Sequence, residues 1–364
     1  MALQAAFTLN PNEIFATIAN MIISQEVFAD NLGKHQTLVD KARVDGSLYG
    51  DKKLYYATDV LKSHPWGADA EASNLLSLDR PADPEVQDIT LDVFRQIRLT
   101  VDNYLSKRAW SNEGAFSSFN SVMLGWMRET KRVYDGTLYN VFIGTAESSI
   151  GAQEQTVLSK DESDPKMEAM VIAQKLADII VEMGDYSRDF NDYGFLRSYA
   201  DDQIKVVWNS KFVNKIRKVD LPTIFHKEGL VDKFEEDVLP ARYFGTKNAS
   251  NVASASANEY RAVYEEDFTV NNVVTHCFPG DYIPAGAAIT AGHGYQEDAD
   301  IICKILVKLP PIMSAFEVGT SFFNPRSLTE NHYLTFGHNT LEALKNYPLV
   351  TLRAAATVVP GDGD

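Results

Sequence analysis

The stretch VQDITLDVFRQIRLTVDNYL, residues 86–105, alternates apolar and polar side chains. Its odd-numbered positions are mostly apolar, and its even-numbered positions from Asp88 to Asp102 are polar or charged except at Phe94. Alternation with a period of two residues predicts a β-strand with one buried and one solvated face. The pattern persists from Ile89 to Val101, a length of roughly 40 Å in a strand, whereas strands usually have about five or six residues. The sequence therefore predicts one unusually long strand whose apolar face needs a cover.

The apolar face of this predicted strand carries six aliphatic side chains. Burying each one stabilises a fold by about 1.5–2 kcal/mol, or roughly 10 kcal/mol together, an upper bound that equals the net stability of a typical domain. A two-stranded ribbon is marginally stable alone, so the ribbon either folds over its own domain or is covered by another chain. Its length favours another chain. The predicted inter-subunit contact residues are Ile89, Leu91, Val93, Ile97, Leu99 and Val101.

The composition is that of a globular protein with an acidic surface. Among 364 residues, 50 are acidic and 34 are basic, which gives a formal net charge of -16. Such a surface repels phosphates and disfavours sequence-specific DNA binding. Cys277 and Cys303 lie far apart without CxxC spacing, which indicates a reducing compartment and no disulfide framework. No signal peptide and no apolar run near the ~20 residues of a membrane span occurs, so we expect synthesis in a cytoplasm and no membrane partner.

Helical spacing dominates the middle of the chain. Apolar residues recur at three- and four-residue steps after Asn112, a plausible N-cap, and predict a long helix that ends near Gly144. Asp164 and Pro165 predict the start of a second helix, with Gly184 as its C-cap. Shorter strands are predicted at 52–61, 204–208 and 301–309 and at the C-terminus, and the small polar residues 246–258 predict a surface loop.

A search for chemistry finds no convergent site. The GHG at 292–294 lacks the third glycine of a dinucleotide fingerprint, because the acidic Glu297 occupies that position, followed by Asp298. Glu297 and Asp300, with Asp281 upstream, could offer oxygen ligands, but they lack the glycine and the spacing of a calcium loop. A solvated acidic turn is the favoured interpretation.

The histidines, cysteines and lysines do not predict a convergent site either. His276 beside Cys277 is the nearest approach to a metal site, and a half-buried strand pair is favoured over it. His332 and His338 are six residues apart, a spacing that places them together on neither a helix nor a strand. The lysines that flank the excursion could cross-link covalently, but they are better interpreted as solubilising charges at an edge strand; they are Lys52, Lys53 and Lys62. We predict no catalytic residue, no cofactor and no metal.

The order of the predicted parts resembles the major capsid protein of tailed double-stranded DNA bacteriophages, which has the Hong Kong 97-type fold. Residues 95–123, RQIRLTVDNYLSKRAWSNEGAFSSFNSVM, are similar to the junction of strand and spine helix in capsid proteins of short-tailed phages. Residues 204–230, IKVVWNSKFVNKIRKVDLPTIFHKEGL, look like part of their axial domain. Residues 322–341, FFNPRSLTENHYLTFGHNTL, resemble their C-terminal segment.

The resemblance implies an α+β fold with five consecutive parts. They are an N-terminal arm at 1–46, an extended β-hairpin (E-loop) at 47–110, a peripheral domain with the spine helix at 111–200, an axial domain at 201–320, and a C-terminal return to the peripheral domain at 321–364. Residues 246–300 are longer and more loop-like than the family pattern implies.

The same resemblance implies a structural protein and no enzyme. Copies would assemble in the host cytoplasm into hexamers and pentamers of an icosahedral shell, the virion capsid, around double-stranded DNA that is not bound sequence-specifically. Because the sequence starts at the arm, it implies a separate scaffolding protein, besides a portal and a decoration protein as further partners. Two alternatives are an encapsulin-type bacterial compartment with a protein cargo and a cytosolic α+β enzyme that uses the acidic cluster near Asp298.

Overall fold

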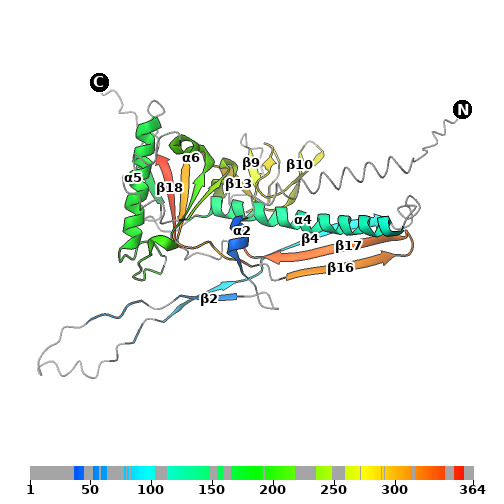
Figure 1. The fold of residues 1–364 in the computed structure, drawn as a ribbon, viewed down its shortest axis with the longest axis horizontal. Coiled ribbons are helices and arrows are strands. Elements are labelled where there is room, and N and C mark those ends of the chain that lie inside the picture. Colours follow the sequence, from blue (N-terminus) through cyan, green and yellow to red (C-terminus); the bar gives the residue numbers. More distant parts are fainter. Residues whose placement is uncertain are drawn as a thin grey trace, which may run out of the picture. The chain divides into compact units, whose positions relative to one another are not determined.

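The computed structural model describes residues 37–44, 52–56, 59–63, 78, 80–81, 83–102, 113–147, 154–158, 165–191, 193–217, 235–247, 259–270, 272–287, 289–290, 292–313, 316–340 and 348–355. They mix helices with sheets and fall into two compact units (Figure 1). Unit 1 takes its described residues from Met1–Asp51, Thr90–Tyr139 and Pro311–Thr340. Unit 2 takes them from Lys52–Ile89, Asn140–Pro310 and Leu341–Asp364.

Unit 1 is built on an antiparallel sheet of three strands in the order β16–β17–β4. The strands are β16 (Phe316–Asn324), β17 (Thr329–His338) and β4 (Val93–Asp102). β4 pairs with β17 along its whole length. A short helix, α2 (Thr37–Ala42), precedes β1 (Arg43–Val44), which pairs in parallel with β15 (Ile312–Met313).

The long helix α4 (Glu113–Thr145) confirms the helix that the apolar spacing predicts. Its residues up to Tyr139 belong to unit 1, and the last turns belong to unit 2. Within unit 2 the end of the helix passes very close to another backbone, because a Cβ added at Gly144 would lie 2.0 Å from the carbonyl oxygen of Tyr243. Only glycine fits this approach.

The core of unit 2 is a five-stranded mixed sheet in the order β5–β18–β14–β6–β7. Its strands are β5 (Glu154–Leu158), β18 (Leu349–Ala355), β14 (Ile301–Leu306), β6 (Lys205–Asn209) and β7 (Glu235–Leu239). The central strands β14 and β6 are buried on both faces, which is why they read as nearly continuous apolar runs. Helices α5 (Pro165–Gly184) and α6 (Ser210–Arg217) contribute to the same apolar core. α5 begins and ends at the predicted proline and glycine.

A smaller β-structure follows in unit 2 and corrects one expectation. A four-stranded sheet in the order β12–β9–β13–β8 consists of β12 (Tyr282–Ile283), β9 (Tyr260–Ala262), β13 (Gly294–Glu297) and β8 (Gly245–Lys247). A hairpin of β10 (Glu266–Val270) and β11 (Val273–Cys277) shares a small core with it. Where the structure describes it, the 246–300 segment therefore contains several short strands and is less loop-like than expected; the strand, turn and strand that the sequence predicts over 273–289 correspond to β11 and β12. Residues 248–258 of the predicted surface loop lie outside the described residues. Two single-turn 3₁₀ helices, Asp201–Gln203 and Ala241–Tyr243, complete the unit.

The prediction of one long strand from Ile89 to Val101 is wrong. The chain forms β3 (Glu85–Ile89), which pairs with β2 (Lys52–Tyr56) in unit 2, and then the separate strand β4 in unit 1. We call the β2–β3 pair the ribbon. Between the strands, Asp92 accepts hydrogen bonds from the hydroxyls of Thr90 at 2.8 Å and Thr340 at 3.1 Å. Alternation continues through the break because it reports which side chains are buried and carries no information about the partner strand.

None of the helices in the described part of the chain is both long and apolar enough to cross a lipid bilayer.

Candidate assembly surface

The alternation along β4 is real and separates two faces of the unit 1 sheet. Even-numbered positions from Phe94 to Thr100 are exposed, whereas the odd-numbered ones are half-buried or buried. Among the six predicted contact residues, Ile89 and Val101 are buried. Leu91, Val93, Ile97 and Leu99 are half-buried.

The odd-numbered face of β4 is the face that α4 covers. Ile97 lies opposite Leu334 and Arg95 lies opposite Phe336 in the β4–β17 ladder, and directly opposed side chains share a face. The Phe336 ring centroid lies 5.4 Å from that of Tyr134 on α4 and 5.3 Å from the Lys131 ammonium nitrogen. Figure 1 shows the helix running along these strands. The apolar face of β4 therefore has a cover within its own chain, and contact of the six residues with a neighbouring chain stays a prediction.

A buried ion pair lies under this part of α4. The Lys131 ammonium nitrogen is 2.6 Å from an Asp135 carboxylate oxygen one helical turn later, and Arg43 approaches the same oxygen at 3.3 Å. Glu317 on β16 lies 3.6 Å from Lys131. Burial raises the pKa of Asp135, and the nearby Lys131 and Arg43 oppose that rise. This arrangement ties α4, β1 and the sheet together, because a buried carboxylate needs its cations close.

His338 closes the same face at the end of β17. Its Nε2 lies 2.8 Å from the Tyr134 hydroxyl, and its Nδ1 lies 3.1 Å from the Asn339 carbonyl oxygen. Because a carbonyl only accepts, Nδ1 carries the proton and Nε2 accepts from Tyr134. Burial lowers the pKa of His338 to about 4, aided by the positive charges of Arg95 and Lys131. The imidazole is therefore a neutral structural group at pH 7.

The opposite face of the sheet is open and carries aromatic side chains. Phe94 is 58% exposed, Phe322 60% and Val318 42%. They share this face because Val318 pairs with Thr335 and Phe322 with Asn331, the residues that lie opposite Gln96 and Thr100 of β4. We call the set Phe94, Gln96, Arg98, Thr100, Val318, Phe322, Asn331 and Thr335 the open face.

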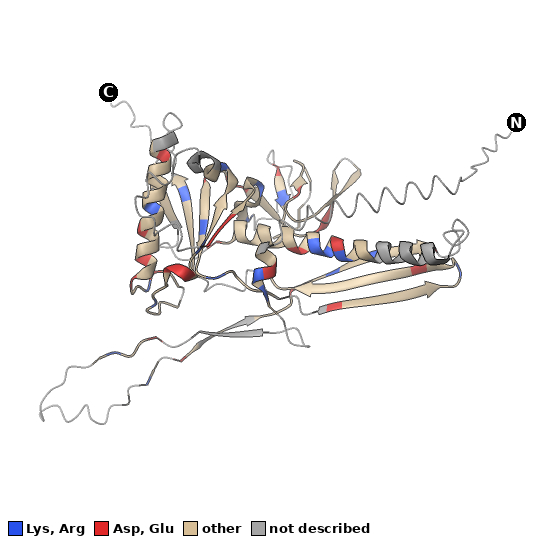
Figure 2. Ribbon diagram, viewed as in Figure 1, with Lys and Arg blue, Asp and Glu red and all other residues tan. Residues whose placement is uncertain are grey.

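Polar side chains on the open face already have partners across the strands. Gln96 donates to the Thr335 hydroxyl at 3.0 Å, and the Thr100 hydroxyl donates to Asn331 at 2.7 Å. Figure 2 shows that the strands of this sheet are largely uncharged. A face of exposed aromatic rings between satisfied polar groups, where the charged Arg98 already donates to Gln96 at 3.0 Å, suits protein contact, since most of its side chains carry no charge that has to be desolvated. In the sequence, Phe94 is an apolar exception among the polar even-numbered positions of β4. This exception is the feature from which the open face could have been predicted.

A groove of about 290 Å³ opens between α4 and the covered face of β16 and β17. It is lined by Met127, Arg128, Gly319, Thr320, Ser321, His332, Tyr333 and Leu334. His332 lies 3.9 Å from Glu330, and no nucleophile–base pair converges there among the described residues. The lining carries no arrangement that points to a reaction.

The other chemical candidates serve local structure. His276 bridges two carboxylates, Asp267 at 2.6 Å and Glu265 at 3.1 Å. Asp298 accepts from the Asp300 amide and forms an ion pair with Arg353. Cys277 and Cys303 are free and buried.

In the described residues, no group of three or more His, Cys, Asp or Glu side chains could hold a metal ion. The flanking lysines are placed as follows: Lys52 and Lys53 lie in β2, and Lys62 is exposed.

Comparisons with known proteins show a shared fold. No protein-family model matches the sequence, and no curated protein matches it. Among solved structures, a chain in the capsid structure of Staphylococcus phage Andhra is 10% identical, with a TM-score of 0.54 over 88% of this chain and 84% of that chain. A chain in the structure of the head fiber and inner core protein gp22 of native bacteriophage P68 is also 10% identical, with a TM-score of 0.54 over 86% of this chain and 83% of that one. The likeness spans nearly the whole chain, and it shows that this α+β fold occurs in phage particles.

Proposed function

We propose that this chain is the major capsid protein of a tailed double-stranded DNA bacteriophage. The observation that carries the proposal is the fold shared over 88% of the chain with a chain of the Andhra capsid structure. Copies assemble into hexamers and pentamers of an icosahedral shell, and the assembled protein is located in the virion. The role is structural and not enzymatic, and the packaged DNA is enclosed without sequence-specific binding. The short tail, the separate scaffolding protein, the portal and the decoration protein that the sequence resemblance implies belong to the proposal.

The proposal assigns the described elements to the parts of the Hong Kong 97-type fold. The ribbon is the extended β-hairpin, and α4 with the three-stranded sheet of unit 1 forms the peripheral domain. The five-stranded sheet with α5 and α6 forms the axial domain, although the sequence-based bounds put β5 and α5 in the peripheral domain and β18 in the C-terminal return. Support for this assignment comes from the order of elements along the chain and from the division into two units. β4 then belongs with the peripheral sheet, since it pairs with β17.

For assembly, we place the contact between copies at the ribbon and the open face. The ribbon is a two-stranded ladder, and such ladders are marginal without further packing. The open face offers exposed Phe94 and Phe322 as anchors, and a few buried aromatic side chains carry most of the energy of a protein contact. Each copy lays its ribbon on the open face of a neighbour, and closed symmetry repeats this contact around the shell. Of the six predicted contact residues, Ile89 lies in the ribbon and Leu91 lies between β3 and β4. The other four, Val93, Ile97, Leu99 and Val101, lie on the face of β4 opposite the open face.

Electron microscopy and sedimentation of the purified protein test the function. We expect hollow closed particles, formed alone or with a co-expressed scaffolding protein. A protein that stays a small soluble oligomer under all assembly conditions contradicts the proposed function. A particle that contains a protein cargo and no DNA supports the compartment alternative instead. The two compared structures come from bacteriophage particles, so neither favours the compartment or the enzyme.

Removing the anchors of the open face tests the assembly contact. Phe94→Ser with Phe322→Ser should abolish particles and leave a folded subunit, because both side chains are exposed in the single chain. Val181→Ser, which removes an apolar side chain that is 67% exposed on α5, is the matched control and should still assemble. Thermal unfolding of all three proteins checks that the subunits remain intact. Normal particles from the double variant contradict the contact but not the function.

A further inference from the structure

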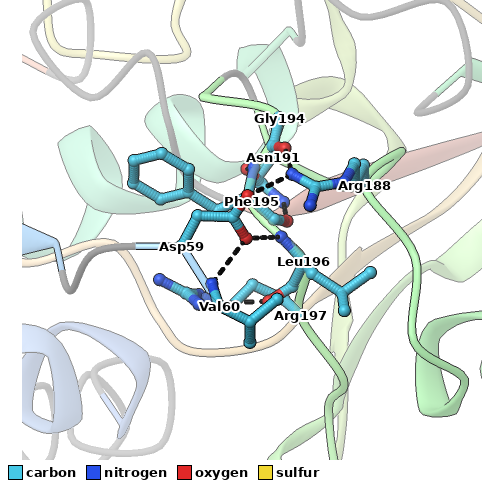
Figure 3. Close-up of polar contacts among 8 residues, drawn as sticks. All are labelled: Asp59, Val60, Arg188, Asn191, Gly194, Phe195, Leu196 and Arg197. Atoms are coloured by element: carbon cyan, nitrogen blue, oxygen red, sulfur yellow. Dashed lines mark hydrogen bonds and ion pairs between the residues drawn. The ribbon is translucent and has the colours of Figure 1, made fainter. Parts of the chain in front are cut away.

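Asp59 lies just beyond the ribbon and is held by a loop that is more than a hundred residues away in sequence. Its neighbours Val60 and Leu61 are 55% and 72% exposed, yet the Asp59 side chain is only 19% exposed. One carboxylate oxygen accepts from the backbone amides of Leu196 and Val60, both at 2.9 Å. The other accepts from Arg188 at 2.5 Å. Figure 3 shows the carboxylate between these donors, and all of them belong to unit 2.

The loop that binds Asp59 is organised by its own hydrogen bonds. Ser187 and Arg197 exchange backbone hydrogen bonds of 3.0 and 2.9 Å. The Asn191 side chain binds both the amide and the carbonyl of Phe195, at 2.9 and 2.8 Å. Gly194 has a positive φ of 63°, a conformation that glycine adopts without strain. These bonds present the Leu196 amide and the Arg188 guanidinium without help from Asp59.

Arg188 is fixed from a second side. Its guanidinium also donates to the Gly194 carbonyl oxygen at 2.5 Å, which holds it over the loop. The loop is anchored in turn to the end of α5, because the Ser198 hydroxyl donates to the Gly184 carbonyl at 2.7 Å and the Tyr199 amide donates to the Met183 carbonyl at 3.0 Å. Donors held in place before binding lose little freedom when they bind.

This contact differs from an ordinary surface salt bridge. Exposed ion pairs usually contribute little, since two long side chains must be ordered in water. Here Asp59 is short, one donor is a backbone amide of the loop, and the arginine is already oriented. The hydrogen bond from the Leu196 amide, followed by that from Arg188, lowers the pKa of Asp59 to about 2. The carboxylate therefore stays ionised at every pH at which the protein is handled.

We propose that residues 187–191 and 193–197 form a carboxylate-binding socket whose occupant is Asp59 of the same chain, and that this latch holds the Tyr56 end of the ribbon at the loop after α5. β2 ends at Tyr56, and three residues of extended chain span at most about 11 Å. When Asp59 occupies the socket, the end of β2 therefore lies within about 11 Å of the socket. The β2–β3 register, Tyr56 opposite Glu85 through Lys52 opposite Ile89, transmits the restraint to β3.

Hydrogen exchange and limited proteolysis of the full-length chain test the latch. In Asp59→Ala and Asp59→Asn, we expect the Leu196 amide to exchange about tenfold faster, as expected for loss of a charge-assisted hydrogen bond. Trypsin should also cut faster after Lys62, which is exposed three residues beyond Asp59. Arg188→Gln should accelerate cleavage in the same way, and Arg188→Gln combined with Asp59→Ala should add little, because both remove one contact.

Asp189→Asn is the matched control, since it removes a negative charge from an exposed position of the same loop. It should leave Leu196 exchange and Lys62 cleavage unchanged. Wild-type rates in both Asp59 variants overturn the latch, and so does equal acceleration by Asp189→Asn. If Asp59→Ala fails to fold, the milder Asp59→Asn decides the matter.

The consequence for assembly rests on the proposed function. A latched ribbon leaves the subunit at one place, so Asp59→Asn should yield fewer closed particles and more aberrant ones in electron micrographs. Failure of the wild-type protein to form any particle would contradict the proposed function, whereas the exchange and cleavage measurements judge the latch in the free chain.

Discussion

At the scale of single residues, burial rather than sequence neighbours determines the behaviour of His338. In the sequence it is one of seven scattered histidines, and its spacing from His332 suggests nothing. The fold places it under Tyr134 and beside Lys131 and Arg95, where a positive charge is disfavoured. Alternation in the sequence predicts which residues of β4 are half-buried. It does not predict the partner of a buried polar group, because that partner comes from a distant part of the chain.

His338 should make unit 1 less stable in mild acid. Its pKa of about 4 in the folded protein lies below the ordinary histidine pKa of 6.5, so the unfolded chain takes up the proton first as the pH falls. The stability is complete above pH 6.5 and is lost progressively down to about pH 4. Between pH 7 and pH 5 the loss is about 2 kcal/mol, at roughly 1.4 kcal/mol per pH unit below 6.5.

Native-state hydrogen exchange of β17 amides measures this loss at pH 7 and pH 5, after correction for the intrinsic pH dependence of exchange. His338→Gln keeps a neutral polar side chain and should remove most of the difference between the two values. An unchanged difference in the variant would show that another group governs the acid sensitivity.

At the scale of elements, the sequence predicts helices better than strands. α4 and α5 follow from local spacing and from caps at their ends, which act within a few residues. The boundary between β3 and β4 depends on which strand each one pairs with, and those partners are β2 and β17. Gln96 and Thr335 meet across 239 positions of sequence, a relation that no local pattern reports.

Two glycines of α4 provide a matched test of its packing. Gly144→Ala should destabilise the protein by at least about 2 kcal/mol, because the new methyl group would overlap the Tyr243 backbone. Gly125→Ala should be neutral or stabilising by up to about 1 kcal/mol, since nothing lies within 4 Å of its added Cβ. Urea unfolding followed by circular dichroism compares the two variants. Equal effects would mean that the close approach of Gly144 to residue 243 does not constrain the fold.

At the scale of the whole molecule, the order of elements along the chain supports the proposed fold. Each compact unit draws on three separate segments, and β4 joins β16 and β17 only after more than two hundred intervening residues. The boundaries at 46, 110, 200 and 320 stay predictions. The open face and the Asp59 socket were missed for the same reason, because each brings together residues from distant segments.

The net charge of -16 predicts how assembly responds to salt. Copies of an acidic subunit repel one another as they approach, and the Debye length falls from about 14 Å at 0.05 M to about 5 Å at 0.4 M salt. Raising sodium chloride over this range should lower the protein concentration at which particles form, as measured by light scattering and sedimentation.

Salt also strengthens apolar contacts, so sodium thiocyanate, which screens charge equally without that second effect, separates the two causes. If both salts promote assembly, charge repulsion between copies is the barrier to assembly. If chloride alone promotes assembly, the salt effect is assigned to the apolar contact of ribbon and open face. Inhibition by both would mean that attraction between charged groups holds the copies together, contrary to an assembly contact built on the apolar side chains of the open face.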